Sequence, residues 1–186
     1  MKIDLAVLED ALEEIIDAHK RVLFRVPPVS IVRLNVTLLE NLLKDGKGAY
    51  ITCHRCHIYV SRLLRKKGYP MDRITFIDPL YRISGDVRKP DECAKLIVTP
   101  FSRHFFPELK NTLEEVDFDF AIMDCITSLL NFQDEATVFS GLKEHLDPVL
   151  GGALFITSAE KGKSFSGPPD FWDQEVEIRR YEAGEG

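Results

Sequence analysis

The order of hydrophobic and polar residues changes its period at two adjacent prolines. Over residues 3–20, apolar side chains recur every three or four positions and acidic side chains lie mostly opposite them, which predicts an amphipathic helix. Pro27 and Pro28 interrupt this pattern, because proline cannot continue a helix. We therefore expect residues 1–26 to form an N-terminal amphipathic helix appendage and residues 27–186 to form the main domain.

Beyond these prolines, short apolar runs rich in β-branched residues alternate with segments of helical period. The short runs predict strands over residues 29–34, 49–52, 73–78, 95–99, 118–123, 152–157 and 175–181. The helical periods lie between them, over residues 37–45, 57–67, 106–115 and 135–146. Strands joined through helices need crossover connections, which favour parallel pairing. The pattern predicts an α/β fold, a three-layer sandwich with a mainly parallel central sheet and helices on both faces.

Composition and charge narrow the function classes. The 186 residues are 45% hydrophobic and carry a formal net charge of −6, which suits a globular domain and argues against broad nucleic-acid binding. No apolar stretch approaches the ~20 residues of a membrane span. Four cysteines without a signal peptide predict reduced thiols. We therefore expect a cytoplasmic protein that binds neither membranes nor nucleic acids.

The turn after the first predicted strand does not match a phosphate-binding loop. Such a loop has the pattern GxxxxGK[ST], because glycines let backbone amides surround the phosphates while the lysine neutralises them. Here the predicted turn is Asn35 and Val36, before a helix that begins at Thr37, and it contains neither glycine nor lysine. The Gly-Lys-Ser at residues 162–164 lacks the first glycine of the pattern. Ordinary P-loop nucleotide hydrolysis is therefore not expected.

Asp124 directly follows the apolar run 118–123. An acidic residue at the end of a buried strand is where nucleotide-binding enzymes hold Mg²⁺, usually through water. An aspartate in this place can equally cap the turn or helix that follows. Asp124 is thus a candidate magnesium-binding carboxylate, with capping as the structural alternative.

Residues 53–57 carry the sequence Cys-His-Arg-Cys-His between a predicted strand and a predicted helix. A dithiol redox centre is one interpretation, since a helix N-terminus and a neighbouring arginine lower the pKa of a thiol. A zinc or iron site is the second interpretation, and attachment of a c-type haem is the third. Two reduced, partly buried cysteines are the structural alternative. The residues available as metal ligands are Cys53, Cys56, His57 and, as a fourth, Cys125 or Cys93.

Basic residues continue beyond this motif. Arg55 is followed by further basic residues at positions 62, 65, 66, 67 and 73. A solvated helix face is the default expectation for such a run. The second interpretation is a contact with an anionic ligand, for which Arg55 is the candidate.

Six segments together resemble the RecA/KaiC-like ATPase superfamily of archaea and bacteria, over roughly residues 29–181. They are Gly48–Thr52, Leu63–Tyr69, Arg73–Asp78, Phe120–Asn131, Gly151–Ser158 and Phe171–Ile178. The family's Walker A segment is replaced here by Val32–Leu39, and its paired glutamates fall on His54 and Arg55. Asp124 matches the family's Walker B residue. The resemblance implies a RecA-like fold in a degenerate member that lacks the P-loop and the catalytic glutamates.

The strand order of that family carries a further implication. The end of the 49–53 strand would lie beside the end of the 118–124 strand. The cysteine–histidine motif would then lie near Asp124 and Cys125, at the edge where the family binds nucleotide.

Three functions follow as expectations. The first is a non-catalytic KaiC-like regulatory or binding module in an archaeal cytoplasm, which associates with itself or with an active KaiC-like relative and needs no cofactor. The alternative is a dithiol redox or metal-binding protein built on Cys53, Cys56 and His57. The second alternative is an ATP-binding protein with a non-standard site at Asp124.

Overall fold

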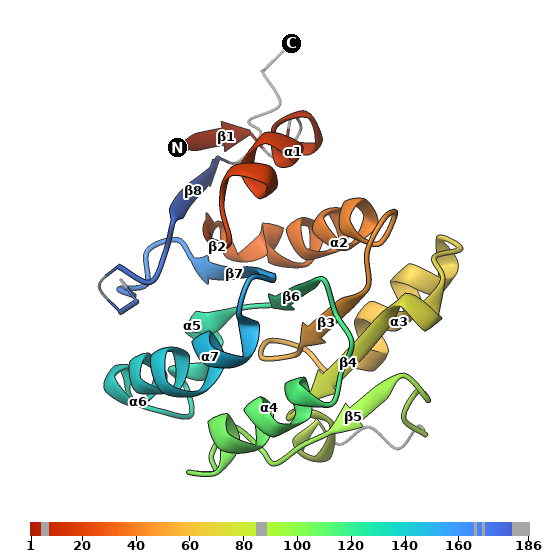
Figure 1. The fold of residues 1–186 in the computed structure, drawn as a ribbon, viewed down its shortest axis with the longest axis vertical. Coiled ribbons are helices and arrows are strands. Elements are labelled where there is room, and N and C mark those ends of the chain that lie inside the picture. The colour runs from red at the N-terminus through yellow and green to blue at the C-terminus, as the bar shows by residue number, and fades with distance from the viewer. Residues whose placement is uncertain (5–7, 85–88, 166, 169, 180–186) are drawn as a thin grey trace.

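One sheet of parallel strands runs through the whole molecule (Figure 1). The computed structural model describes residues 1–4, 8–84, 89–165, 167, 168 and 170–179. Within them, eight strands pair in the order β1-β8-β2-β7-β6-β3-β4-β5, each parallel to its neighbours. The strands are β1 (Lys2–Asp4), β2 (Arg21–Val26), β3 (Gly48–Ile51), β4 (Ile74–Asp78), β5 (Ala94–Leu96), β6 (Phe120–Met123), β7 (Leu154–Glu160) and β8 (Gln174–Arg179).

Helices cover both faces of this sheet. They are α1 (Leu8–Ala18), η2 (Pro28–Ser30), α2 (Ile31–Leu42), α3 (His57–Lys66), η3 (Met71–Arg73), η4 (Tyr81–Ile83), α4 (Phe105–Glu114), α5 (Ile126–Leu129), α6 (Glu135–Ser140), the π-helical η5 (Gly141–Leu146) and α7 (Asp147–Leu150). One apolar core joins α1, α2 and α3 to the sheet through Leu12, Leu34 and Leu64. A second core joins α4 and η5 to the sheet through Leu109 and Leu142. Two cores arise because successive residues of a strand point to opposite faces.

This architecture confirms the predicted α/β fold class. The six strands predicted from residue 49 onward correspond in order to β3 through β8. The predicted N-terminal amphipathic helix is present in part, as α1, whereas Ile3 and Asp4 at the start of the predicted range belong to strand β1. Among the described residues, none of the helices combines the length and the apolar character needed to cross a membrane.

The strand predicted over residues 29–34 is wrong, because this segment forms η2 and the start of α2. Ile31, Leu34 and Leu38 are fully buried, and their spacing places them on one side of a helix. Adjacent apolar residues satisfy both the helical and the strand period when a run is short, and β-branched residues favoured the strand. Once Leu38 is included, the spacing of the apolar residues fits a helix and no longer fits a strand.

The structure also corrects the boundary expected between residues 26 and 27. β2 lies inside the sheet, between β7 and β8. Its residues Val22, Leu23 and Phe24 are fully buried. The strand over residues 21–26 was not predicted, because the helical pattern of α1 leads directly into these residues. The N-terminal segment is thus part of the sheet, and the two prolines lie in the turn between β2 and α2.

Candidate functional site

Three strands end side by side at the carboxyl edge of the sheet. β3 pairs with β4 on one side and with β6 on the other, and all three run in the same direction. The turn of residues 52–56 follows β3, Asp78 ends β4, and Asp124 follows β6. This arrangement confirms the expected proximity of the cysteine–histidine motif to Asp124. Ligand sites of open parallel sheets usually lie beyond this edge.

Asp124 closes the turn after β3. Its Oδ1 accepts the backbone N–H groups of Cys53 and His54 at 2.6 and 2.8 Å. Its Oδ2 accepts the backbone N–H of Arg55 at 3.4 Å. The side-chain amide of Asn35, on α2, donates to the carbonyl oxygen of Asp124 at 2.9 Å. Both carboxylate oxygens are thus used within the protein, and Asp124 caps the turn after β3 instead of the turn that follows it in sequence.

The surroundings of Asp124 disfavour its charged form. Burial raises the pKa of this carboxyl to about 7, although the three backbone N–H donors act in the opposite direction. The negative charge of Asp78 adds to the rise. Near neutral pH the carboxyl is therefore partly protonated. A Mg²⁺ ion at this carboxyl would have to displace its proton and compete with its backbone donors.

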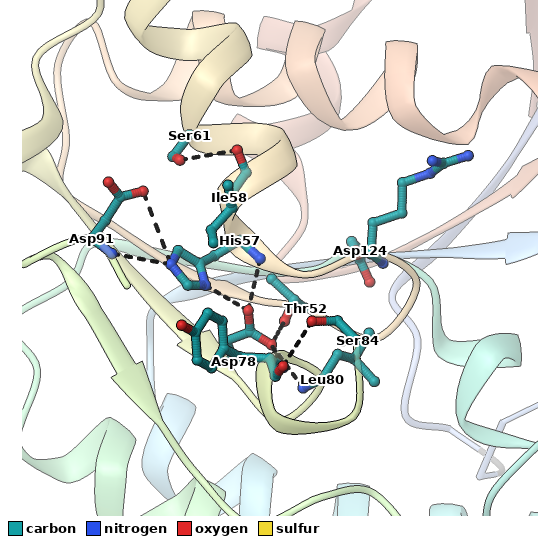
Figure 2. A network of polar contacts seen from close by, with 11 residues as sticks. Thr52, His57, Ile58, Ser61, Asp78, Leu80, Ser84, Asp91 and Asp124 are labelled. Carbon is teal, nitrogen blue, oxygen red and sulfur yellow. Dashed lines mark hydrogen bonds and ion pairs between the residues drawn. The ribbon is translucent and has the colours of Figure 1, made fainter. Parts of the chain in front are cut away.

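A second buried carboxylate, Asp78, is the centre of a polar network at the end of β4 (Figure 2). Its Oδ1 accepts the Thr52 hydroxyl at 2.8 Å and the backbone N–H groups of Leu80 and Tyr81 at 2.7 and 2.9 Å. Its Oδ2 accepts the backbone N–H of His57 at 2.7 Å and lies 2.6 Å from the Nδ1 of the same residue. Asp78 therefore ties together β3, the N-terminus of α3 and the chain that follows β4.

His57 is fully buried and uses both ring nitrogens within the protein (Figure 2). Nδ1 faces Asp78, and Nε2 accepts the backbone N–H of Asp91 at 3.3 Å. The Asp78 carboxylate can only accept, so Nδ1 is the donor of that contact, while Nε2 also lies 3.9 Å from the Asp91 carboxylate. The imidazole is thus committed to the network around Asp78.

The residues predicted as metal ligands do not come together. Within the part of the chain that the structure describes, no three histidine, cysteine, aspartate or glutamate side chains form a group suited to a metal ion. Cys53 packs in the core beneath α4, whereas Cys125 packs in the core beneath α1, α2 and α3. Cys93 lies directly before β5 and packs at the edge of the latter core. The residues expected as metal ligands therefore lie in different parts of the structure and do not form one site.

The thiols differ from those of a typical redox centre. None of the four cysteines, all of which lie in the described residues, forms a disulfide. Burial raises the pKa of Cys53 well above its ordinary value, and the charge of Asp124 adds to this. Burial likewise raises the pKa of Cys93 and of Cys125. A dithiol redox centre depends on a lowered thiol pKa, so these directions oppose it.

A pocket of about 470 Å³ opens beside the turn after β3. His54 and Arg55 line it from that turn, Tyr59 lines it from α3, and Ser128 and Asn131 line it from α5 and beyond. Nδ1 of His54 lies 3.1 Å from the Ser128 hydroxyl oxygen. The Arg55 guanidinium lies over the Tyr59 ring, 4.9 Å from its centroid. The sequence candidate for an anion contact thus lies at the wall of a pocket.

The turn between β2 and α2 lacks the residues of a phosphate-binding loop. It consists of Pro27, Pro28, Val29 and Ser30, without glycine or lysine. The backbone N–H of Ser30 donates to the Pro27 carbonyl at 2.8 Å, and that of Ile31 donates to the Pro28 carbonyl. Proline itself has no N–H group. Most backbone donors of this turn are therefore missing or already used.

Reasoning from the sequence missed three residues of this region. The turn predicted at Asn35 is wrong, because Asn35 lies inside α2, buried, with its amide on Asp124. Asp78 carried a positional signal, since it and Asp124 each end a buried strand next to β3. Ser128 carried no signal beyond that of a helix-capping residue.

The comparisons with known proteins concern the fold. No protein-family model matches the chain, and no curated protein does. Among solved structures, the chain is similar to a KaiC-like protein of the hyperthermophilic archaeon Pyrococcus horikoshii OT3, with a TM-score of 0.52 and 15% sequence identity. The match covers 76% of this chain and 63% of that protein, so the chain spans less than two thirds of its length. Together with the all-parallel sheet, this similarity shows that the chain has an α/β fold of the KaiC-like, RecA type.

Proposed function

We propose that this chain is a non-catalytic KaiC-like module that acts by binding or regulation and has lost ATP hydrolysis. The observation that carries the proposal is the turn between β2 and α2. A P-loop ATPase needs a glycine-rich, lysine-bearing turn between a strand and a helix, because adjacent amides and the lysine hold the phosphates. The chain contains no GxxxxGK[ST] segment, and this turn begins with two prolines.

The hydrogen bonds of the turn explain why phosphates would bind poorly there. Pro27 and Pro28 offer no N–H group, and the N–H groups of Ser30 and Ile31 already donate to carbonyls of the same turn. A triphosphate would have to break these hydrogen bonds and would find no lysine beside it. Phosphate binding at this turn would thus break two backbone hydrogen bonds and would gain no positive charge to offset the negative charge of the phosphates.

The carboxyl side of the site gives independent support. Asp124 uses both carboxylate oxygens on backbone N–H groups, so a magnesium ion would have to compete with them. The paired glutamates implied by the family resemblance are replaced by His54 and Arg55. Neither of these residues supplies a carboxylate base for water.

Nucleotide binding and turnover test the proposal together. We expect the Tm of the purified protein to stay constant in millimolar MgATP, and phosphate release to equal that of a blank without protein. A Tm that rises with ATP concentration, as binding to the folded state requires, would contradict the proposal. Turnover that disappears in Asp124→Asn but persists in the exposed control Asp45→Asn would support the ATP-binding alternative at Asp124.

Thiol titration and metal analysis test the dithiol and metal alternative. We expect Cys53 to react slowly with a thiol reagent at neutral pH, because burial disfavours its thiolate. We also expect no stoichiometric zinc or iron in the purified protein. A thiol that titrates well below ~8.5, or one metal ion per chain, would favour the alternative instead.

We also propose that the module works in an archaeal cytoplasm through association with a second copy or with an active KaiC-like relative. The similarity of the fold to a KaiC-like protein supports this choice of partner. Light scattering over a range of concentrations tests self-association: the measured mass should rise above the 21.2 kDa of one chain.

A further inference from the structure

The pocket beside the turn after β3 differs in charge from the rest of the molecule. The chain has 30 acidic and 24 basic residues, yet no aspartate or glutamate is among the described residues that line this pocket. Three other cavities, of about 740, 550 and 610 Å³, each include at least three acidic residues in their walls. In this acidic protein, the described lining of the pocket thus contains one permanent cation, Arg55, and no carboxylate.

Arg55 is the principal cation of this pocket. Its guanidinium lies over the Tyr59 ring, and within the described part of the chain no carboxylate forms an ion pair with it. Stacking on an aromatic ring orients a guanidinium and leaves its N–H groups in the plane able to donate. His54, half-buried and held by the Ser128 hydroxyl, lies on the same wall. These donors suit a carboxylate, sulfonate or phosphate group.

Exposed apolar side chains gather at the rim of the pocket. Five large hydrophobic side chains are exposed among the described residues, and two of them, Tyr59 and Ile83, line this pocket. A third, Phe101, packs edge-to-face against Phe132, another lining residue, with ring centroids 4.7 Å apart. Clustered exposed apolar groups mark binding surfaces more often than single ones do. A flat ring between these side chains would remove them from water.

We propose that this pocket binds a small organic anion that carries a flat apolar ring system. The anionic group would accept hydrogen bonds from Arg55, and the rings would lie among Tyr59, Ile83 and Phe132. A cavity of about 470 Å³ lies within the range of small-molecule sites and holds a molecule of two fused rings. The inference gives a ligand class to the proposed binding role, but it concerns the turn after β3 and not the phosphate position after β2.

Two probes of nearly the same shape separate the contribution of the anionic group from that of the rings. Naphthalene-2-sulfonate carries the anion and naphthalene-2-sulfonamide does not, so both are titrated by calorimetry into the wild type and into variants. We expect one sulfonate per chain and a clearly weaker sulfonamide. Arg55→Gln should weaken the sulfonate about tenfold and leave the sulfonamide unchanged, because a charge-assisted hydrogen bond is lost. Arg62→Gln, an exposed arginine of α3 outside the pocket, should change neither.

Ile83→Ser provides the matching test of the apolar rim. This exposed substitution should weaken both probes by a similar factor, since each loses the same contact with its rings. The proposal is overturned if the sulfonate shows no saturable binding at millimolar concentration. It is equally overturned if sulfonate and sulfonamide bind alike, or if Arg62→Gln acts as strongly as Arg55→Gln. ATP binding that persists in Arg55→Gln would overturn the proposed loss of nucleotide binding and leave this pocket assignment intact.

Discussion

Asp78 and Asp124 end the strands on either side of β3, yet their surroundings shift the two carboxyl groups in opposite directions. Both are nearly fully buried, with 1% and 2% of their surface exposed. Burial alone would raise the pKa of each. The pKa of Asp78 nevertheless lies below its ordinary value, because hydrogen bonds from His57, Thr52 and Leu80 outweigh burial. The pKa of Asp124 rises to about 7.

Deeper burial of Asp124 within the protein and the number and kind of donors together explain the difference. Asp78 receives three backbone N–H groups, a hydroxyl and an imidazole N–H, five donors in all. Asp124 receives three backbone N–H groups, the longest at 3.4 Å, and the charge of Asp78 repels its own. Equivalent places at a sheet edge therefore hold one fixed anion and one group that titrates near neutrality. Position in the fold alone does not determine the charge of a buried acid.

The two carboxyls affect stability in different pH windows. The pKa of Asp78 is lower in the folded than in the unfolded chain, so its contribution is present above about pH 4 and is lost as the pH falls below that. The folded state instead holds the proton of Asp124 more tightly than the unfolded state does. The free energy of unfolding therefore falls as the pH rises from about 4 to about 7.

The largest expected effect is that of Asp78→Asn. The new amide places an NH₂ group where an oxygen accepts two or three hydrogen bonds, so several buried donors lose their partner. We expect the free energy of unfolding at pH 7 to fall by about 3 to 5 kcal/mol, measured by urea denaturation. The exposed control Asp45→Asn should change it by less than about 0.5 kcal/mol. A loss below about 1 kcal/mol for Asp78→Asn would mean that the network of Figure 2 contributes little.

At a single pH, Asp124→Asn should have a smaller net effect on stability, and its sign should depend on the pH. The asparagine oxygen can still accept the N–H groups of Cys53 and His54, and the variant no longer has a carboxyl to ionise. Relative to the wild type, the variant's stability should rise by up to about 4 kcal/mol between pH 4 and pH 8, because a pKa raised from 3.8 to about 7 corresponds to that free energy. Urea denaturation at several pH values measures this difference. Asp10, an exposed residue of α1, provides the control: the stability of Asp10→Asn should change with pH as that of the wild type does. If the stability of Asp124→Asn also followed that of the wild type, the raised pKa of Asp124 would be refuted.

Much of the fold was predictable from the sequence because crossover connections constrain it strongly. Apolar runs separated by helical segments imply a parallel sheet, and six of the strands lie where the pattern places them. The N-terminal part was not predictable in the same way. In the sequence, no proline or glycine separates residues 21–26 from the amphipathic pattern before them, and residues 29–34 are rich in β-branched residues but are helical. At residues 29–34, local strand propensity was overridden by burial of a helix against the sheet.

The candidate site was predictable only in outline. The family resemblance implied that Asp124 lies near the cysteine–histidine motif, and the pairing of β3 with β6 shows this. The role of His57 did not follow, because the sequence offered it only as a candidate metal ligand, whereas its partner Asp78 is 21 residues away. Hydrogen bonds of this kind depend on turn geometry, and no periodic pattern encodes them.

Thr52→Val is the smallest of the expected effects and the finest test of the comparison. It removes one of the five donors to Asp78, so we expect a loss of about 1 kcal/mol in urea denaturation at pH 7. Thr52→Ser keeps the hydroxyl and should retain most of that stability, so an equal loss in both variants would assign the effect to packing. Because Asp78 stays ionised above about pH 4 in either variant, the decline of stability between pH 4 and 7 should match that of the wild type. A changed decline would mean that the two carboxyls titrate as one coupled unit instead of two separate groups.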